Sequence, residues 1–384
     1  MKQKLMTQKL MTQKHLFYIG LLVISFSCKA QKVTEKMPPK SKNVILLIGD
    51  GTGLSQISSA FYFKKTRPNY ARFKHIGLIS TSSSREDITD SAAGATAFAS
   101  GIKTYNGAIG VSDDSTNVKT LVEIVSRLNI KTGVISTSSI QHATPASFYA
   151  HVLNRGLYED IAADMVTSDI DFFAGGGKQF FNRRKDGENL LEDLEAKGFG
   201  IDTIDLSKFS EINQYSKMAY LLAENHMKPV AKGRGNFLPK ATELGIQFLN
   251  KDPDNANFFV MIEGSQIDWG GHANDAAYLI SELIDFDDAI GKALDFAEKD
   301  GNTLVIVTAD HETGGFTLAS TLKKRKDGTS YSDYNEITGT FSTKGHSATL
   351  IPVFAYGPGA EAFSGVYENT EIFHKILEAT HWNK

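Results

Sequence analysis

The chain has 384 residues, of which 41% are hydrophobic and 22% charged, with a net charge of −3. This composition is typical of a globular protein, and it excludes a disordered polymer, a collagen-like repeat and a disulfide-rich scaffold. Residues 1–42 hold nine lysines and one glutamate, so the rest of the chain has 32 basic and 43 acidic residues, a net charge of −11. Such an acidic body disfavours general nucleic-acid binding, which needs basic contacts to phosphate, and suits the binding of cations.

The N-terminus has the features of an export signal. Four lysines precede the apolar run LFYIGLLVISFS at 16–27, which has 12 residues; this is too short to span a membrane and is typical of a signal-peptide core. The single cysteine, Cys28, follows the run and resembles the acylated cysteine of a bacterial lipoprotein. The alternative is cleavage near Ala30, which would discard Cys28. We expect a signal peptide at 1–28, a linker at 29–42, and a location in the periplasm or, through acylated Cys28, on a membrane or cell surface.

Apolar runs alternate with helical patterns along the rest of the chain. The clearest helical pattern covers residues 273–299, where apolar residues recur three or four positions apart. The runs that predict buried strands are NVILLI at 43–48, TGVIS at 132–136, FFVMI at 258–262, TLVIV at 303–307 and PVFAY at 352–356. This alternation predicts an α/β fold with a central, mostly parallel sheet flanked by helices on both faces. We expect one catalytic domain over 43–384, with a short polar insertion at about 319–345.

Metal-ligating side chains gather where the predicted strands end. In sheets of this kind ligands bind at the carboxyl ends of the strands, and mixed oxygen and nitrogen donors suit Zn²⁺. Taken singly, an aspartate after a strand is more often a turn or cap residue, and a histidine is more often structural. The collection predicts a metal site, with these candidates: Asp50, Glu263, Asp268, His272, Asp310, His311 and His346.

Ser91 is the candidate nucleophile. The segment TDSAAGATA at 89–97 indicates a turn that enters a helix of small residues. Ser91 would lie at the N-terminus of that helix, where free backbone N–H groups and the helix dipole favour anions. The alternative is an ordinary serine N-cap. No histidine or lysine lies nearby in sequence to act as a base, so activation of the hydroxyl by a metal ion is the expected route.

Six segments of the sequence resemble the bacterial alkaline phosphatases. They occur in the order found in that family and together extend from residue 43 to residue 358. The resemblance implies the alkaline-phosphatase fold, and hydrolysis of phosphate monoesters to an alcohol and inorganic phosphate through a phosphoserine. The segments are NVILLIGDGTG (43–53), TDSAAGATAFASGIKTYNGAIG (89–110), TSSIQHATPASFYAHVLNR (137–155), FFVMIEGSQIDWGGHAND (258–275), VIVTADHETGG (305–315) and KGHSATLIPVFAYGP (344–358).

The resemblance also implies two Zn²⁺ ions and one Mg²⁺ ion in a shared site. By motif, the first zinc would be held by Asp268, His272 and His346, and the second by Asp50, Asp310 and His311. Asp50 would bridge to the third metal, which Thr144 and Glu263 would also bind. Arg155 would hold the phosphate that Ser91 attacks, although an ordinary salt bridge is the alternative for an isolated arginine.

Two positions depart from the common bacterial pattern. His142 stands where many members have aspartate, and Trp269 stands where many have lysine. His142 would ligate the third metal or support its ligands, which makes Zn²⁺ an alternative occupant of the third site; an inert polar role is the other interpretation. Trp269 would line the substrate site, and the absence of a lysine there predicts weaker retention of phosphate.

Three hypotheses of function follow. The first is a metal-dependent phosphomonoesterase with broad specificity for small monoesters and an alkaline pH optimum. The second is a phosphodiesterase or phosphonate hydrolase with a similar bimetal core. The third is an inactive exported metal-binding protein. The sequence predicts no nucleic-acid binding as such, and a monomer or a homodimer.

Overall fold

The first predicted strand, NVILLI, becomes the centre of the sheet. It forms β1 (Asn43–Gly49), and all seven residues are buried. Alternate side chains of a strand point to opposite faces of its sheet, so Val44, Leu46 and Ile48 pack into one hydrophobic core while the residues between them pack into the other. Burial of one such side chain contributes about 1.5–3 kcal/mol. This strand therefore requires cover on both faces.

The structure is a computed structural model that describes residues 41–252, 254 and 257–382. The predicted signal peptide, Cys28 and most of the predicted linker lie outside the described residues. Ser41 and Lys42, which we predicted to be linker, belong to the folded body, because Ser41 Oγ donates to the carbonyl of Pro358 and Lys42 N to that of Asn302. Within the described part, no helix is long and apolar enough to cross a membrane.

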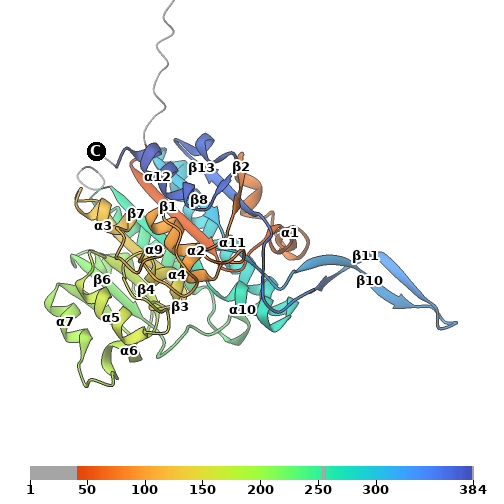
Figure 1. Ribbon diagram of the computed structural model, residues 1–384, viewed down its shortest axis with the longest axis horizontal. Coiled ribbons are helices and arrows are strands. Elements are labelled where there is room, and N and C mark those ends of the chain that lie inside the picture. The colour runs from red at the N-terminus through yellow and green to blue at the C-terminus, as the bar shows by residue number, and fades with distance from the viewer. Residues whose placement is uncertain (1–40, 253, 255–256, 383–384) are drawn as a thin grey trace, which may run out of the picture. The chain divides into compact units, whose positions relative to one another are not determined.

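A ten-stranded sheet runs through the described residues in the order β14-β2-β13-β8-β1-β7-β3-β4-β6-β5 (Figure 1). All neighbouring strands pair in parallel except at β13, which is antiparallel to both β8 and β2. The predicted mostly parallel sheet is confirmed. Besides β1, its strands are β2 (His75–Ser80), β3 (Lys131–Ser139), β4 (Phe172–Gly176), β5 (Phe199–Asp202), β6 (Lys217–Leu221), β7 (Phe258–Gly264), β8 (Thr303–Thr308), β13 (Ile351–Tyr356) and β14 (Gly365–Glu368).

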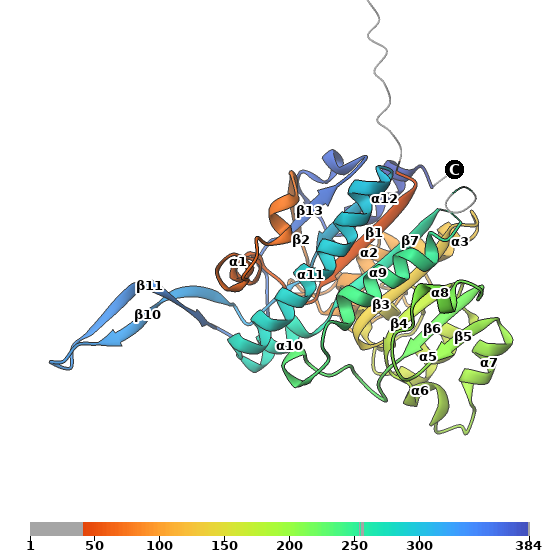
Figure 2. The ribbon, with the colours of Figure 1, turned by 180° about the vertical axis from the view of Figure 1, so that it is seen from behind.

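Helices cover both faces of the sheet, as predicted. Figure 2 looks onto α9 and α11, which pack with α1 into one core, and Figure 1 looks from the other side onto α2 and α4. The helices are α1 (Leu54–Phe63), α2 (Ser91–Ser100), α3 (Leu121–Ser126), α4 (Ala143–Ala146), α5 (Tyr158–Thr167), α6 (Gln179–Asn182), α7 (Leu190–Ala196), α8 (Phe209–Ile212), α9 (Phe237–Leu249), α10 (Gln266–Ala273), α11 (Ala276–Asp300) and α12 (Glu371–Thr380).

The predicted helix at 273–299 begins later than expected. Residue Ala273 ends α10, and Asn274 adopts a left-handed conformation with φ 52°. Asp275 then caps α11, because its side chain accepts from the backbone N–H of Tyr278. The apolar periodicity could not locate this break, since it lies in a single residue with positive φ.

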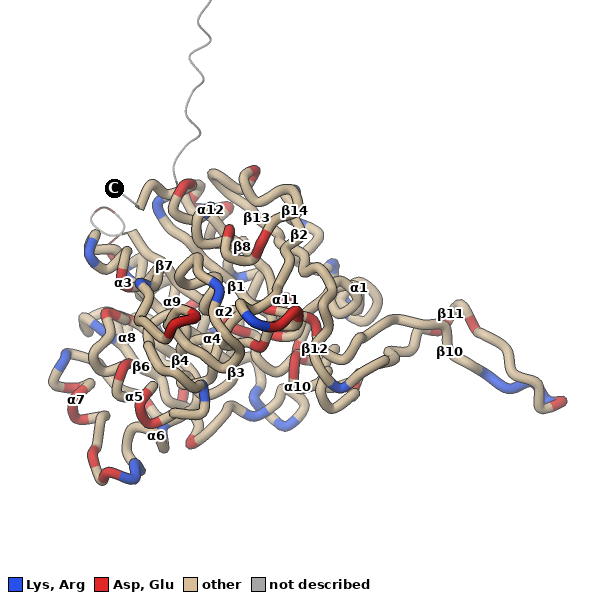
Figure 3. Tube along the Cα trace, in the orientation of Figure 1, with Lys and Arg blue, Asp and Glu red and all other residues tan. Residues whose placement is uncertain are grey.

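The predicted polar insertion forms a hairpin of β10 (Thr317–Lys324) and β11 (Ser330–Thr340). Figures 1 and 2 both show it extending away from the sheet. Lys323 to Lys326 form the basic stretch near its tip in Figure 3. At the base of the hairpin, β9 (Glu312–Thr313) pairs with β12 (His346–Ser347), and these two short strands carry residues of the site described next.

Candidate active site

The predicted metal ligands converge at one edge of the sheet. Asp50 and Asp310 follow the ends of β1 and β8, and Glu263 is the second-last residue of β7, opposite Ile48 of β1. His346 precedes β13, whose start lies at this same edge because the strand runs opposite to the others. One reversed strand thus adds a histidine to an edge built from the carboxyl ends of parallel strands.

The candidate nucleophile begins a helix, as predicted. Ser91 is the first residue of α2, and Asp90 is the N-cap, whose side chain accepts from Ala93 N. The hydroxyl of Ser91 is therefore not used as the cap. Its Oγ lies 3.3 Å from Nε2 of His311, and the residue is only 2% exposed.

The first donor set contains Asp268, His272 and His346, whose ligand atoms all lie within 4.8 Å of one another. The Nε2 atoms of the two histidines are 3.2 Å apart, and that of His272 is 3.3 Å from Asp268 Oδ1. Nδ1 of His272 contacts the carbonyl of Lys344, and Nδ1 of His346 contacts that of Thr89. Carbonyls only accept, so both Nδ1 atoms carry the proton and both Nε2 lone pairs face the set.

A second donor set surrounds His311. Its Nε2 lies 3.3 Å from Asp310 Oδ2 and 3.6 Å from Asp50 Oδ1. Asp268 contributes here as well, since its carboxylate, that of Asp50 and the His311 ring also offer atoms within 4.8 Å of one another. Backbone N–H groups of Gly51 and His311 bond Asp310 Oδ1, which fixes the carboxylate and leaves Oδ2 for the set.

A third donor set joins Asp50, His142 and Glu263, again within 4.8 Å. Ser136 and Ser265 donate to Glu263 Oε2 at 2.6 and 2.7 Å, and the Thr144 hydroxyl also favours the ionised form of this carboxyl. His142 is the N-cap residue of α4, and its Nε2 lies 3.4 Å from Arg155 Nη2. The structure therefore brings His142 beside both Asp50 and Glu263, and Thr144 beside Glu263.

The electrostatics of these sets suit cations. Burial, followed by the charges of Asp310, Asp268 and Glu263, raises the pKa of Asp50 well above its ordinary value. Neither Asp50 oxygen has a hydrogen-bond donor, and Asp310 Oδ2 has none either. Buried carboxylates without donors are costly unless a cation neutralises them.

Burial favours the neutral form of His311 and His142, one histidine in each of the second and third sets. Burial lowers the pKa of His311 to about 3, and burial followed by the charge of Arg155 lowers the pKa of His142. A neutral imidazole has the free lone pair that a metal ion requires. Fully buried carboxylates without donors, next to neutral histidines, therefore fit divalent cations of the zinc and magnesium kind.

Arg155 is held at the rim of the donor sets. Its Nη1 donates to Asp90 Oδ2 at 2.8 Å, and its backbone N–H donates to the carbonyl of Gly107. The turn at Asn106 and Gly107 also positions Asp90, because Asn106 Oδ1 accepts from Asp90 N and Gly107 N donates to Asp90 Oδ2. Asp90 was not predicted as a site residue, and the Asn106-Gly107 pair was the available signal of a tight turn.

Trp269 belongs to an aromatic cluster beside the third set. Its ring centroid lies 5.9 Å from that of His142 and 4.9 Å from that of His226, in edge-to-face arrangements. Nδ1 of His226 accepts from Ser139 N, which fixes its ring. His226 was not predicted as a site residue, because it neither follows a predicted strand nor lies in a recognised motif.

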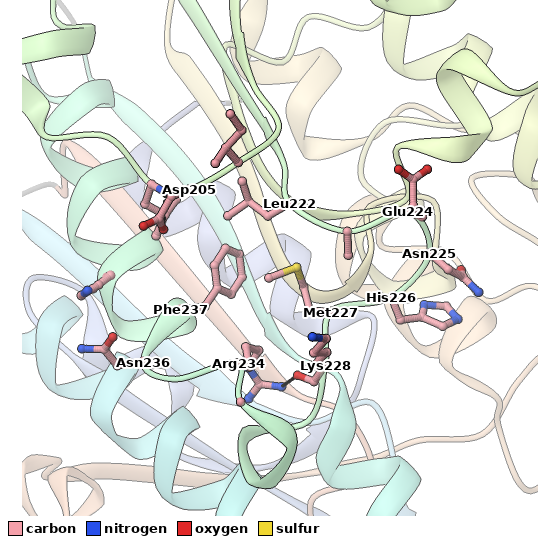
Figure 4. A pocket seen from close by; sticks show the side chains of 15 residues that line it. Asp205, Leu222, Glu224, Asn225, His226, Met227, Lys228, Arg234, Asn236 and Phe237 are labelled. Atoms are coloured by element: carbon pink, nitrogen blue, oxygen red, sulfur yellow. Dashed lines mark hydrogen bonds between the residues drawn. The ribbon is translucent and has the colours of Figure 1, made fainter.

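His226 also borders a cavity of about 580 Å³. Figure 4 shows Leu222, Met227 and Phe237 facing one another across it, with the His226 imidazole directed away from them. None of the residues in the three donor sets lines this cavity. The cavity therefore adjoins the candidate active site through His226 and is not lined by any donor residue.

The predicted site residues thus lie around one region of the fold, and the chain as a whole is similar to known proteins. A sequence model of the alkaline phosphatase family matches residues 41–330 and 320–382. Alkaline phosphatase 3 of Bacillus subtilis (strain 168) is 34% identical, over 92% of this chain and 92% of its own length. The alkaline phosphatase of Escherichia coli (strain K12) is 31% identical, over 88% of this chain and 86% of its own length.

Two solved structures are closely similar. Alkaline phosphatase from the Antarctic bacterium TAB5 aligns with a TM-score of 0.87 and 66% identity, covering 90% of this chain and 100% of its own. A TAB5 variant with a histidine replaced by aspartate, and with Mg bound in its M3 site, aligns with a TM-score of 0.89 and 68% identity over the same shares. The chain therefore belongs to the alkaline phosphatase family.

Proposed function

We propose that the chain hydrolyses small phosphate monoesters through a phosphoserine at Ser91. The observation that carries this proposal is the Ser91 hydroxyl, freed from capping by Asp90 and lying 3.3 Å from His311 Nε2 among buried carboxylates. Ser91 Oγ would attack phosphorus while the ester P–O bond breaks and the alcohol leaves. Water would then attack the phosphoserine, release Ser91 and yield inorganic phosphate.

We propose two Zn²⁺ ions and one Mg²⁺ ion as cofactors, with Zn²⁺ as the alternative in the third site. When bound, they supply positive charge that stabilises the attacking and leaving oxygens and lowers the pKa of the serine hydroxyl. The proposed ligands are Asp268, His272 and His346 for the first zinc, Asp50, Asp310 and His311 for the second, and Asp50, Glu263, Thr144 and His142 for the third metal. The unsatisfied oxygens of Asp50 and Asp310 support this assignment.

Arg155 would bind the phosphate itself. Its Nη1 is engaged by Asp90, and Nη2 faces the third set, where its contact is His142 Nε2 at 3.4 Å. A planar guanidinium can bond two non-bridging oxygens of a phosphoryl group at once. Trp269 would close the other side of the substrate region through its contact with His142.

The test combines a variant with a chemical trap. We expect Ser91→Ala to abolish hydrolysis of 4-nitrophenyl phosphate while metal content, measured by elemental analysis, stays as in wild type. Acid quenching of wild type with labelled phosphate should leave label on the peptide that contains Ser91. Full activity in Ser91→Ala would show that another group is the nucleophile.

A phosphodiesterase or phosphonate hydrolase is the second candidate, because such enzymes would use a similar bimetal core. The third donor set and Arg155 favour monoesters, since a monoester carries one more negative charge to neutralise. Comparing kcat/KM for 4-nitrophenyl phosphate and bis(4-nitrophenyl) phosphate distinguishes the two, and a preference for the bis ester would reject our proposal. An inactive exported metal-binding protein would show metal content without turnover of either ester.

The remaining properties are also proposals. We propose a broad substrate range and an alkaline pH optimum, which a pH–rate profile peaking below neutrality would contradict. We propose export to the periplasm or cell surface, with acylation of Cys28 as the membrane-attached form; mass spectrometry of the mature N-terminus separates this from cleavage near Ala30. We propose a monomer or homodimer, which sedimentation equilibrium would decide.

A further inference from the structure

Thr313 lies between the first and second donor sets without belonging to either. It is fully buried in β9, and its backbone N–H donates to the carbonyl of Gly51, next to Asp50. Its own carbonyl accepts from Gln56 Nε2. Backbone contacts therefore fix Thr313 in position whatever its side chain does.

The hydroxyl of Thr313 contacts one candidate ligand from each set. Oγ1 donates to Asp268 Oδ1, and it lies 3.2 Å from His311 Nδ1. A carboxylate oxygen can only accept, so the single hydroxyl proton must point to Asp268. The contact with His311 is then attractive only when Nδ1 carries a proton and donates to Oγ1. That tautomer leaves the lone pair on Nε2, the atom that faces Ser91, Asp50 and Asp310.

The side chain of Thr313 has little freedom to turn away. A Cβ added at Gly51 would lie 2.9 Å from Thr313 Oγ1, and one added at Gly271 would lie 2.9 Å from its Cγ2. Both sides of the side chain are thus packed against backbone that has no room for a larger residue. The hydroxyl and methyl groups of Thr313 occupy separate, closely fitted spaces.

We infer that Thr313 is a positioning residue, whose hydroxyl joins the two proposed zinc sites by the chain His311 Nδ1–H to Thr313 Oγ1–H to Asp268 Oδ1. The inference rests on the metal assignment in the proposed function and adds a residue that this assignment does not contain. The Thr313 hydroxyl orients one Asp268 oxygen and sets the tautomer of His311, so both proposed ligands depend on the same group. Hydrogen-bond partners of metal ligands typically change metal affinity by about 10–100-fold when removed.

The experiment compares Thr313→Val, which keeps the shape but loses the hydroxyl, with Thr313→Ser, which keeps the hydroxyl but loses the methyl. Zinc affinity is measured on the purified full-length enzyme by competition with a chelator of known affinity, followed by elemental analysis. We expect Thr313→Val to bind both zinc equivalents about 10–100-fold more weakly, and Thr313→Ser to bind zinc as wild type does. If Thr313 had a purely structural role, Thr313→Ser would bind zinc more weakly than Thr313→Val, because serine leaves a cavity where the methyl group was.

Thr308→Val is the matched control. Thr308 is also buried, at the end of β8, and its hydroxyl contacts only backbone carbonyls. This variant should lose stability without losing zinc. Equal zinc affinity in Thr313→Val and wild type would overturn the inference, whereas a wild-type enzyme that binds no zinc would overturn the proposed function instead.

A spectroscopic measurement on wild type keeps the inference testable if Thr313→Val does not fold. In the zinc-loaded enzyme with ¹⁵N-labelled histidine, the His311 ring should give a slowly exchanging Nδ1–H signal, assigned by its loss in His311→Gln. An Nδ1 atom without a proton would contradict the proposed chain.

Discussion

Asp90 binds the side chain of Arg155 and the N-terminus of α2 at the same time. Its Oδ2 accepts from Arg155 Nη1 at 2.8 Å, and its Oδ1 accepts from Ala93 N at 3.0 Å. Burial opposes ionisation of this carboxyl, but Arg155 and the backbone N–H groups outweigh it, so its pKa is lowered. One carboxylate thus positions both the proposed nucleophile and the proposed phosphate ligand.

We therefore predict that Asp90→Ala raises KM and lowers stability together. Loss of the cap should cost about 1 kcal/mol of unfolding free energy, and Arg155 loses the partner that orients it. The measurements are steady-state kinetics and urea unfolding. Thr120→Ala is the control, since Thr120 caps α3; it should lower stability by a similar amount with KM unchanged. An unchanged KM in Asp90→Ala would show that Arg155 binds substrate equally well without its contact to Asp90.

Removal of the metals should leave the buried carboxylates repelling one another, which lowers the stability of the folded state. We predict that the metal-free form of Asp50→Asn is more stable than metal-free wild type by about 1–4 kcal/mol, because an uncompensated buried charge is replaced by a neutral group. The metal-loaded forms should rank in the opposite order. Thermal unfolding before and after chelation measures both rankings. A wild-type melting temperature that does not change on chelation would contradict the prediction.

The pair His151 and Glu123 predicts a pH dependence of stability away from the metal site. Nε2 of His151 lies 3.4 Å from Glu123 Oε1, and the pKa of His151 is raised by Glu123 although burial opposes it. A histidine with a raised folded pKa contributes stability below its ordinary pKa of 6.5 that is lost as pH rises through the folded value.

Unfolding free energy should therefore fall as pH rises from about 6.5, and Glu123→Gln should flatten this slope. Urea unfolding across this range provides the measurement. An equal slope in wild type and Glu123→Gln would mean that the pair contributes nothing measurable to folding.

His142→Asp should increase the preference of the third proposed metal site for Mg²⁺ over Zn²⁺. Replacing a neutral imidazole beside Asp50 and Glu263 with a carboxylate gives an oxygen-rich set, which suits Mg²⁺ better than Zn²⁺. With both ions supplied at equal concentration, elemental analysis should show a lower zinc-to-magnesium ratio in His142→Asp than in wild type. An unchanged ratio would argue that His142 does not contact the third ion.

Trp269→Lys should strengthen inhibition by inorganic phosphate. The Trp269 ring packs against His142, which lies 3.4 Å from Arg155 Nη2, so a lysine here would bring a second cation towards the phosphate. A hydrogen bond to a charged group contributes about 1.5 kcal/mol or more, which is roughly tenfold in Ki. Trp269→Phe serves as the uncharged control. An unchanged Ki in Trp269→Lys would place Trp269 outside the phosphate region.

Much of this arrangement could be predicted from sequence because it follows local rules. Buried β-branched runs fixed the strands, and the residues that follow parallel strands meet at one edge by geometry alone. The location of Ser91 at a helix start was readable from the turn before it. The sequence could not distinguish Ser91 from Asp90 as the cap, since both residue types cap helices well.

Other features depend on tertiary pairing and left no local signal. The reversal of β13 arises from its pairing with β2 and β8, and nothing in PVFAY reports strand direction. The contacts of Thr313 with Asp268 and of His226 with Trp269 join segments that are distant in sequence. A threonine after a histidine, or a histidine in a loop, is unremarkable until the chain is folded.

The reversed strand has a consequence for the order in which the site can be completed. His346 enters the site with β13, whereas its proposed partners Asp268 and His272 lie on α10, at least 74 residues earlier in the chain. Before β13 pairs with β8, the proposed first set would have only two of its three donors in place. Binding of the first ion and pairing of the reversed strand should therefore be coupled, so that each favours the other during folding.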